Sequence, residues 1–423
     1  MAKKKKIRIE TYGCAVNQAD SEIMAGLLSG QGFESGDNSG IVIVNTCAVK
    51  TPTERKILKR LNELKNSKNK VIVTGCLPAS QPNVVENFPD FSFIGTNVFD
   101  ILNAVNSVFE GRRFVRIENE LKHRVCTPRI RRNPFIGIIP IAQGCTGSCS
   151  YCIVRKARGT LRSYPSELIV KDVEKALSEG VKEIWITAQD TGAYGIDISE
   201  DLPGLLRRIT EIKGNFRIRV GMMNPNHALR FLNELIEIYK NEKIYKFLHI
   251  PVQSGDDNVL RDMERRYSVN EFREIVSKFR RNIPEITIST DVIVGFPTED
   301  DTAFQNSVNL LREIEPDILN ISRFWARPGT KAERMKQLHG RITKSRSRRM
   351  SKLFEEIGLK RNRRWIGWKG KALVSEIGKS GSFCARNFAY KPIILKSGKN
   401  LLGRFVNVEI IDATSYDLRG RLI

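Results

Sequence analysis

Gly144-Cys145-Thr146-Gly147-Ser148-Cys149-Ser150-Tyr151-Cys152 carries three cysteines with the spacing C-x3-C-x2-C. The stretch directly follows a predicted strand, and its glycines allow a loop to wrap closely around a ligand. Three soft thiolates in one short loop suit the ligation of an iron–sulfur cluster. We therefore start from this loop and ask what fold and what reaction surround it.

Three cysteine ligands, rather than four, would leave one iron of a [4Fe–4S] cluster open, as catalytic metal sites do. S-adenosylmethionine can fill such a position through its amino and carboxylate groups, and an electron from the cluster then breaks a carbon–sulfur bond to give a deoxyadenosyl radical. The alternative is a structural zinc loop, which usually needs a fourth Cys or His at short spacing. None lies nearby, so Cys145, Cys149 and Cys152 are predicted as the catalytic cluster ligands.

A second triad consists of Cys14, Cys47 and Cys76, each at the end of a predicted strand. The carboxyl ends of parallel strands gather at one edge of a sheet, where ligands bind, so these cysteines can converge on a second cluster. The alternative is three buried cysteines that act as small apolar side chains. Cys126 and Cys384 have no such partners and are expected to be core or surface thiols.

The region around the second triad alternates between β-branched runs and helix-spaced apolar residues, which predicts an N-terminal parallel α/β sandwich. Its predicted strands are Ile7–Gly13, Ile41–Asn45, Val71–Thr74 and Phe91–Ile94, and its predicted helices are Asp20–Leu28, Thr53–Leu64 and Val98–Phe109. A basic, irregular stretch at Leu121–Arg132 marks the end of this region.

Six further strands follow, and each except the last precedes a helical segment. This pattern predicts a central open six-stranded (β/α) partial barrel, with the chemistry at the carboxyl ends of its strands. The predicted strands are Phe135–Ala142, Glu183–Ala188, Arg217–Met222, Lys246–Val252, Thr287–Val294 and Ile318–Phe324.

The last part of the chain changes to alternating, glycine-punctuated strands after a charged helical linker at Arg341–Arg364. The pattern predicts a small all-β barrel, a fold that often binds nucleic acid. Its predicted strands are Lys371–Ile377, Phe388–Lys396, Val406–Ile411 and Leu418–Ile423. The whole is an α/β multidomain protein with predicted domains at residues 4–112, 131–360 and 361–423.

The charge of the chain points to a polyanionic partner. Seventy Lys and Arg face 47 Asp and Glu among 423 residues, a formal net charge of +23, and nucleic acid is the leading candidate. The lysines at Lys3–Lys6 are not followed by an apolar segment, and no apolar run approaches a membrane span, so we expect a soluble, cytoplasmic protein. Eight cysteines in such a compartment favour metal binding over disulfides.

The order of short motifs resembles the methylthiotransferase family of radical S-adenosylmethionine enzymes along essentially the whole chain. The motifs are Thr11-Tyr12-Gly13-Cys14, Asn45-Thr46-Cys47-Ala48-Val49, Thr74-Gly75-Cys76, Gln143-Gly144-Cys145, His249-Ile250-Pro251-Val252-Gln253-Ser254-Gly255, Arg265-Arg266-Tyr267, Asp291-Val292-Ile293-Val294-Gly295-Phe296-Pro297 and Arg327-Pro328-Gly329-Thr330. The tail resembles the TRAM domain, an RNA-binding β-barrel.

The resemblance implies an N-terminal methylthiotransferase domain with an auxiliary [4Fe–4S] cluster on Cys14, Cys47 and Cys76, a radical SAM domain with the other [4Fe–4S] cluster, and a TRAM domain. It also implies that S-adenosylmethionine supplies both the radical and the methyl group. The expected partners of the protein are tRNA, bound at the anticodon stem-loop, an electron donor such as a flavodoxin or ferredoxin, and a sulfur source. The protein is expected to be a monomer.

Two stretches, Gln189–Gly195 and Val49–Glu54, resemble the archaeal and eukaryotic branch of the family. Members of that branch methylthiolate carbon-2 of threonylcarbamoyladenosine at position 37, next to the tRNA anticodon. Relatives act on isopentenyladenosine in tRNA or on an aspartate of a ribosomal protein, and the high positive charge favours RNA. A non-enzymatic alternative is an RNA-binding protein whose clusters sense redox state.

Tyr151 precedes the last cluster cysteine and is expected to contact the adenine of the cofactor, with core packing as the alternative. Four residues at or just beyond predicted strand ends are also expected to bind the cofactor: Gln189, Gln253, Ser254 and Gly295. His249 is expected to be a core histidine with a hydrogen-bond partner. Three residues could reach tRNA or the adenine substituent, and ordinary salt bridges explain them about as well: Arg266, Tyr267 and Arg327. Six linker arginines could form a solvated helical face, but their position next to the predicted RNA-binding tail favours contacts to phosphates. They are Arg346, Arg348, Arg349, Arg361, Arg363 and Arg364.

Overall fold

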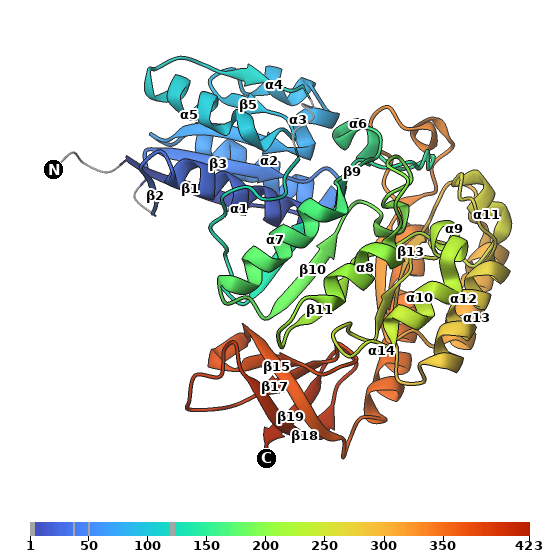
Figure 1. Ribbon diagram of the computed structural model, residues 1–423. Helices are drawn as coiled ribbons and strands as arrows, with labels where there is room; N and C mark the ends of the chain where they lie inside the picture. Colours follow the sequence, from blue (N-terminus) through green and yellow to red (C-terminus); the bar gives the residue numbers. More distant parts are fainter. Residues whose placement is uncertain (1–4, 37–38, 50, 119–122) are drawn as a thin grey trace.

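The computed structural model describes residues 5–36, 39–49, 51–118 and 123–423. Parts of three stretches named above lie outside these residues: Lys3 and Lys4, Lys50, and residues 121–122. Figure 1 shows the N-terminal sheet and the C-terminal barrel at opposite ends of the molecule, with the central part between them.

The N-terminal sheet has six parallel strands in the order β2-β1-β3-β4-β5-β6. The strands are β1 (Lys5–Thr11), β2 (Phe33–Ser35), β3 (Ile41–Thr46), β4 (Lys70–Gly75), β5 (Ser92–Ile94) and β6 (Val115–Arg116). The helices are α1 (Ala15–Ser29), α2 (Thr51–Lys65), α3 (Cys76–Ser80), α4 (Asn83–Asn87), η1 (Val98–Asp100) and α5 (Ile101–Phe109). The predicted sandwich is confirmed. The strands β2 and β6 were not predicted, because strands this short show no alternation of apolar and polar residues.

The central part contains two three-stranded parallel sheets, β11-β10-β7 and β12-β13-β14. The amide of Met223, after β11, donates to the carbonyl of His249 in β12 at 3.1 Å, so the sheets continue into one open barrel. The strands are β7 (Ile136–Pro140), β10 (Glu183–Thr187), β11 (Arg217–Val220), β12 (Phe247–His249), β13 (Thr287–Val294) and β14 (Ile318–Arg323), beside the short antiparallel pair β8 (Ala142–Gln143) and β9 (Arg162–Ser163). The predicted partial barrel is confirmed.

Helices on the outside of the barrel bury a continuous apolar core against the strands. They are α7 (Ser166–Ser178), α8 (Leu202–Glu211), α9 (Pro225–Ala228), η3 (Leu229–Phe231), α10 (Leu232–Tyr239), α11 (Asp257–Asp262), α12 (Val269–Asn282) and α13 (Asp301–Ile314). Three short segments of the central part pack in smaller separate clusters: α6 (Val154–Arg158), η2 (Thr191–Ala193) and η4 (Lys331–Arg334). Because the strands of the N-terminal and central sheets are parallel, both cysteine triads come at carboxyl ends of strands.

The C-terminal part is a closed barrel with the strand order β15-β16-β17-β19-β18, which confirms the predicted small all-β barrel. Its elements are β15 (Lys369–Ile377), η5 (Lys379–Gly381), β16 (Phe383–Arg386), β17 (Pro392–Leu395), β18 (Phe405–Ala413) and β19 (Leu418–Leu422). The barrel contacts the amino-terminal side of the central strands, where the carbonyl of Phe388 accepts from the amide of Lys246 at 2.8 Å. Asp317, just before β14, pairs there with Lys391 at 2.9 Å and with Arg361 at 3.0 Å.

The linker forms one long helix, α14 (Gly340–Arg363), which runs from the cysteine end of the central part to the barrel. The prediction that all its arginines contact phosphates is wrong for two of them. Arg346 is buried and pairs with Glu299 at 2.7 Å, and Arg361 is buried against Asp317. Within the described ranges, no helix combines the length and the apolar character needed to cross a bilayer.

Candidate active site

The loop with the three closely spaced cysteines is held by backbone contacts at both ends. Gly144 has a φ of +79°, and a Cβ there would lie 1.9 Å from the carbonyl oxygen of Thr160, so only glycine fits. The amide of Gly144 donates to Oε1 of Gln189 at 2.7 Å. The amide of Cys145 donates to the carbonyl of Gly159 at 3.3 Å, so the chain returns to the start of the loop directly after α6 ends.

Donors surround the thiols of this loop. The amide of Gly147 donates to Sγ of Cys145 at 3.2 Å, and Arg265 donates to Sγ of Cys149 at 3.2 Å. Arg265 also stacks over the ring of Tyr267, whose hydroxyl donates to the carbonyl of Val252 at 2.7 Å. A fixed guanidinium beside a sulfur favours the thiolate that binds iron.

A buried polar relay supports the same loop from β10 and α9. The Asp190 carboxylate accepts from Nδ1 of His227 at 2.7 Å and from the side chain of Asn224 at 2.7 Å, and Nε2 of His227 lies 3.4 Å from the hydroxyl of Thr146. Burial alone would raise the pKa of Asp190, but the hydrogen bonds from His227 and Asn224 hold it below its usual value. The carboxylate therefore stays charged and fixes the ring of His227.

The second triad lies at three neighbouring strand ends of the N-terminal sheet: Cys14 caps α1, Cys47 follows β3, and Cys76 begins α3 after β4. Asn17 connects two of these ends, because its side chain donates to the carbonyl of Thr46 at 2.8 Å and its Oδ1 lies 3.4 Å from Sγ of Cys14. Burial raises the pKa of Cys47 to about 11. The predicted convergence on one edge of the sheet is what the strand order produces.

Arg158 at the end of α6 reaches this second triad. Its Nε donates to Sγ of Cys76 at 3.4 Å, and its Nη2 lies 2.9 Å from Asp20 and 3.2 Å from Oδ1 of Asn17. The side chain is almost fully buried. A charge from the central part therefore lies beside a thiol of the N-terminal part.

The donor sets suit clusters rather than single ions. In the part of the chain that the structure describes, no three Cys, His, Asp or Glu side chains are close enough to share one metal ion. The cysteines of a cubane cluster each bind a different iron and therefore stand further apart than the ligands of one ion. Three thiols with a neighbouring arginine are present in each triad, and this chemistry fits an iron–sulfur cluster at each.

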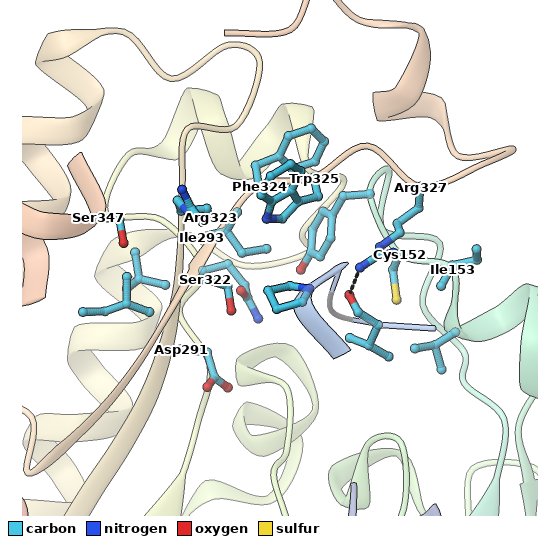
Figure 2. A pocket seen from close by; sticks show the side chains of 17 residues that line it. Cys152, Ile153, Asp291, Ile293, Ser322, Arg323, Phe324, Trp325, Arg327 and Ser347 are labelled. Carbon is cyan, nitrogen blue, oxygen red and sulfur yellow. Dashed lines mark hydrogen bonds between the residues drawn. The ribbon is translucent and has the colours of Figure 1, made fainter. Parts of the chain in front are cut away.

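A cavity of about 400 Å³ opens between the central and N-terminal parts (Figure 2). Cys152 and Tyr151 line it from the loop with the three closely spaced cysteines, and Val49 lines it from the N-terminal part. The amide of Val49 donates to Sγ of Cys47 at 3.5 Å, so this wall continues into the second triad. The other lining residues are Pro52, Ile153, Val154, Gln253, Asp291, Val292, Ile293, Ile321, Ser322, Arg323, Phe324, Trp325, Arg327 and Ser347.

The five residues expected to bind the cofactor occupy different places. Tyr151 and Gln253 line the cavity, and the ring of Tyr151 meets Phe296 edge-on at 6.4 Å. Gln189 holds the cysteine loop, as described above. Ser254 is fully buried, and Gly295 packs against α14; neither is among the described residues that line the cavity, and their contact with a cofactor stays a prediction.

Among the residues that the structure describes, the remaining polar candidates except Arg266 have interaction partners. Nε2 of His249 lies 2.8 Å from Oδ2 of Asp291, as expected of a core histidine with a hydrogen-bond partner. Tyr267 is buried and engaged with backbone carbonyls, so it is not available to tRNA. Arg327 pairs with Glu54 and donates to the carbonyl of Val49 at 2.7 Å. Arg266 is exposed beside the cysteine loop.

The two remaining cysteines lie apart from both triads. Cys126 is exposed, and its thiol lies 3.4 Å from the carbonyl of Leu168. Cys384 is buried in β16 of the C-terminal barrel. Both positions agree with the expectation of core or surface thiols.

Comparison with known protein families divides the chain in the same way as its fold. The radical SAM superfamily matches residues 139–311, the uncharacterized protein family UPF0004 matches residues 6–94, and the TRAM domain matches residues 366–423. Cys145, Cys149 and Cys152 lie in the first match, and Cys14, Cys47 and Cys76 lie in the second.

Full-length relatives settle the family. A protein of Pyrococcus abyssi named "Probable threonylcarbamoyladenosine tRNA methylthiotransferase" is 49% identical over 99% of both chains. The chain belongs to the threonylcarbamoyladenosine tRNA methylthiotransferase family. Members from Xenopus laevis and Homo sapiens are 36% and 35% identical over 98% of this chain and over 77% and 74% of their own lengths. The resemblance found from the motifs is confirmed, and so is its archaeal and eukaryotic branch.

Solved structures share the fold of this family member at low sequence identity. The radical S-adenosylmethionine methyltransferase TsrM from Kitasatospora setae superposes with a TM-score of 0.57 at 14% identity, over 78% of this chain and 74% of that one. The radical enzyme OxsB has a TM-score of 0.53 at 10% identity, over 82% and 56% of the two chains. Membership in the superfamily implies S-adenosylmethionine and iron–sulfur chemistry for the chain.

Proposed function

We propose that this chain inserts a methylthio group at carbon-2 of threonylcarbamoyladenosine at position 37 of tRNA, next to the anticodon. The observation that carries the proposal is the shared cavity between the two triads, which Cys152 lines directly and which Val49 connects to Cys47. An aromatic C–H bond has no acidic proton, so a hydrogen atom must be removed and sulfur delivered at the same carbon. Both sets of cysteines must therefore serve one cavity.

The six cysteines are proposed to hold two [4Fe–4S] clusters, one on Cys145, Cys149 and Cys152 and one on Cys14, Cys47 and Cys76. When bound, the first cluster supplies the electron that cleaves S-adenosylmethionine, and the second supplies the open iron from which sulfur is transferred.

The protein's own residues position these groups. Gln189 fixes the start of the first loop, and Arg265 keeps a positive charge beside Cys149. Tyr151 and Gln253 face the space that the cofactor and the nucleoside would share. The aromatic walls of Phe324 and Trp325 exclude water from that space, which protects a reactive radical.

The partner is proposed to be tRNA, bound through its anticodon stem-loop. The net charge of +23 and the TRAM match support RNA as the ligand. Exposed Lys and Arg side chains line α14, which connects the cavity to the C-terminal barrel. The chain is proposed to act as a monomer in the cytoplasm, with a flavodoxin or ferredoxin as electron donor and a separate sulfur source.

The test uses the anaerobically reconstituted full chain with S-adenosylmethionine, dithionite, sulfide and tRNA that carries threonylcarbamoyladenosine. Nucleoside mass spectrometry should show a gain equal to SCH3 replacing H, together with deoxyadenosine. Parallel reactions with isopentenyladenosine tRNA and with ribosomes should give no product. Deoxyadenosine without a modified nucleoside in the first tRNA would contradict the proposal, and product on ribosomes or on the second tRNA would reassign the substrate.

A further inference from the structure

Two arginines line the cavity between the triads, and they differ in what they bind. The guanidinium of Arg327 is occupied by Glu54 and by the carbonyl of Val49. Arg323, the last residue of β14, has no carboxylate partner among the residues that the structure describes. In Figure 2, Arg323 and Cys152 lie on opposite sides of the view, with the cavity residues between them.

Arg323 is held by stacking rather than by an ion pair. Its guanidinium lies 5.4 Å from the ring centroid of Trp325, and the guanidinium of Arg55 lies 5.3 Å from the same ring. Stacking fixes the plane of a guanidinium but leaves its N–H donors available. Arg323 is half-buried, and a partly desolvated cation with available donors favours an anionic ligand.

Asp291 also lines the cavity, but its carboxylate lies too far along the sheet from Arg323 to be the anionic partner of that guanidinium. In the register of β13 with β14, Arg323 is opposite Val294, three residues beyond Asp291, which is about 10 Å at roughly 3.3 Å per residue. Asp291 is moreover bonded to His249. The cavity thus has a polar end at Asp291 and a cationic end at Arg323.

We propose that Arg323 binds the α-carboxylate of the threonyl group on the substrate nucleoside and thereby selects it over adenosines with an uncharged substituent. The inference rests on the proposed function. The planar fork of a guanidinium matches a carboxylate in a bidentate pair. The carboxylate ends the substituent on N6, several bonds from carbon-2, so it can lie at Arg323 while carbon-2 faces Cys152. The carboxylate of S-adenosylmethionine is expected at the open iron, on the other side of the cavity.

The test compares two anticodon stem-loop RNAs that differ only in charge at this group: one with threonylcarbamoyladenosine and one with its threonyl methyl ester. The wild-type chain should modify the acid with a kcat/KM about 10- to 100-fold above that of the ester, the range of a charge-assisted bidentate pair. Arg323→Gln should bring the two rates within about threefold of each other, and Arg323→Lys should give an intermediate ratio, because a point charge lacks the planar fork.

Arg281→Gln is the matched control, because it removes the same charge from the exposed surface of α12. It should keep the wild-type ratio. The affinity of the wild-type chain for the two RNAs, measured by fluorescence anisotropy, gives a second readout that does not depend on any variant folding.

Equal rates for acid and ester with the wild-type chain, or an unchanged ratio in Arg323→Gln, would overturn the assignment of Arg323 while leaving the proposed function intact. Absence of product on both RNAs, with deoxyadenosine still formed, would instead overturn the proposed function and this inference with it.

Discussion

Arg158 donates to the sulfur of Cys76 at 3.4 Å, although 82 residues separate them in the chain. Arg158 ends α6, and α6 begins two residues after Cys152. One short helix therefore connects the loop of Cys145, Cys149 and Cys152 to the second triad. A displacement of the loop would move a buried positive charge that lies beside the second triad.

Replacing Arg158 by Gln should lower the reduction potential of the cluster proposed on Cys14, Cys47 and Cys76. A positive charge next to a ligand sulfur stabilises the reduced, more negative cluster, so its removal should shift the potential downward by on the order of 100 mV. The measurement is an EPR redox titration of the chain in which Cys145, Cys149 and Cys152 are replaced by Ala. Arg112→Gln, at an exposed position, is the control and should leave the potential unchanged. Equal potentials in both variants would contradict the effect of Arg158.

The two triads should separate two steps. Replacing Cys145, Cys149 and Cys152 by Ala should abolish deoxyadenosine formation, because no cluster remains to bind the cofactor. Replacing Cys14, Cys47 and Cys76 should spare deoxyadenosine but stop the methylthio product. Both products are measured by mass spectrometry in the same reaction. Loss of deoxyadenosine in both sets would argue against a division of labour.

Gln189→Ala should weaken the radical site without removing a ligand. The amide of Gly144 would lose its acceptor, and removal of supporting hydrogen bonds around metal sites typically costs about 10- to 100-fold in metal affinity or activity. Iron content and deoxyadenosine yield check this. Gln189→Glu keeps an acceptor and should restore most of the yield; if it fails as badly as Ala, the hydrogen bond is not the cause.

Acid should loosen the contact between the C-terminal barrel and the central part. Burial alone would raise the pKa of Asp317, but the charges of Lys391 and Arg361 hold it below its usual value. A depressed carboxyl pKa adds stability that is complete above the unfolded pKa of about 3.9 and is lost as pH falls through the folded value. Thermal unfolding should therefore show this contribution constant from about pH 5 to 8, and falling below about pH 4.

Asp317→Asn removes the same charge at neutral pH. It leaves the buried Lys391 uncompensated and should destabilise the chain by about 3–5 kcal/mol. Asp412→Asn, at an exposed position of β18, is the control and should change stability little. A destabilisation no larger than that of the control would show that the buried pair contributes nothing.

Exposed basic residues of α14 should set the salt dependence of tRNA binding. Replacing Arg348, Lys352 and Arg363 by Gln should weaken binding and reduce the slope of log K against log salt by about one for each phosphate that is no longer neutralised. Filter binding between about 50 and 200 mM salt measures the slope. The same number of charges removed from other helices, at Lys59, Lys171 and Arg281, should leave the slope nearly unchanged.

The sequence predicted the strands that carry the cysteines because β-branched runs and strand order are local signals. Cys14, Cys47 and Cys76 could be grouped from the positions of the predicted strands alone, since parallel strands end at one edge. The side chains that support them could not: Arg158, Arg265 and the Asp190–His227 pair act across long sequence separations. Spacing carries no information about such contacts.

The arginines of α14 illustrate the same limit. Six were predicted as phosphate contacts from their charge and their position beside the predicted RNA-binding tail, yet Arg346 and Arg361 face inward and are neutralised by Glu299 and Asp317. Positions 346, 350, 353, 354, 357 and 361 follow a helical repeat of buried residues, so the apolar periodicity placed these two on the inner face. The prediction gave more weight to charge than to helical periodicity, although periodicity was the better guide to which side chains are buried.

The length of α14 sets a scale for the RNA. The helix of 24 residues is about 36 Å long at about 1.5 Å per residue, and it rises about 24 Å from Ser347, which lines the cavity, to Arg363, which precedes the barrel. A rigid helix fixes the distance between the cavity and the barrel. In the proposed complex, the barrel can therefore bind only nucleotides at that distance from the nucleoside in the cavity. Shortening the stem of the RNA below this length should abolish the contribution of the barrel to binding in one step. Changing the loop sequence should leave that contribution unchanged.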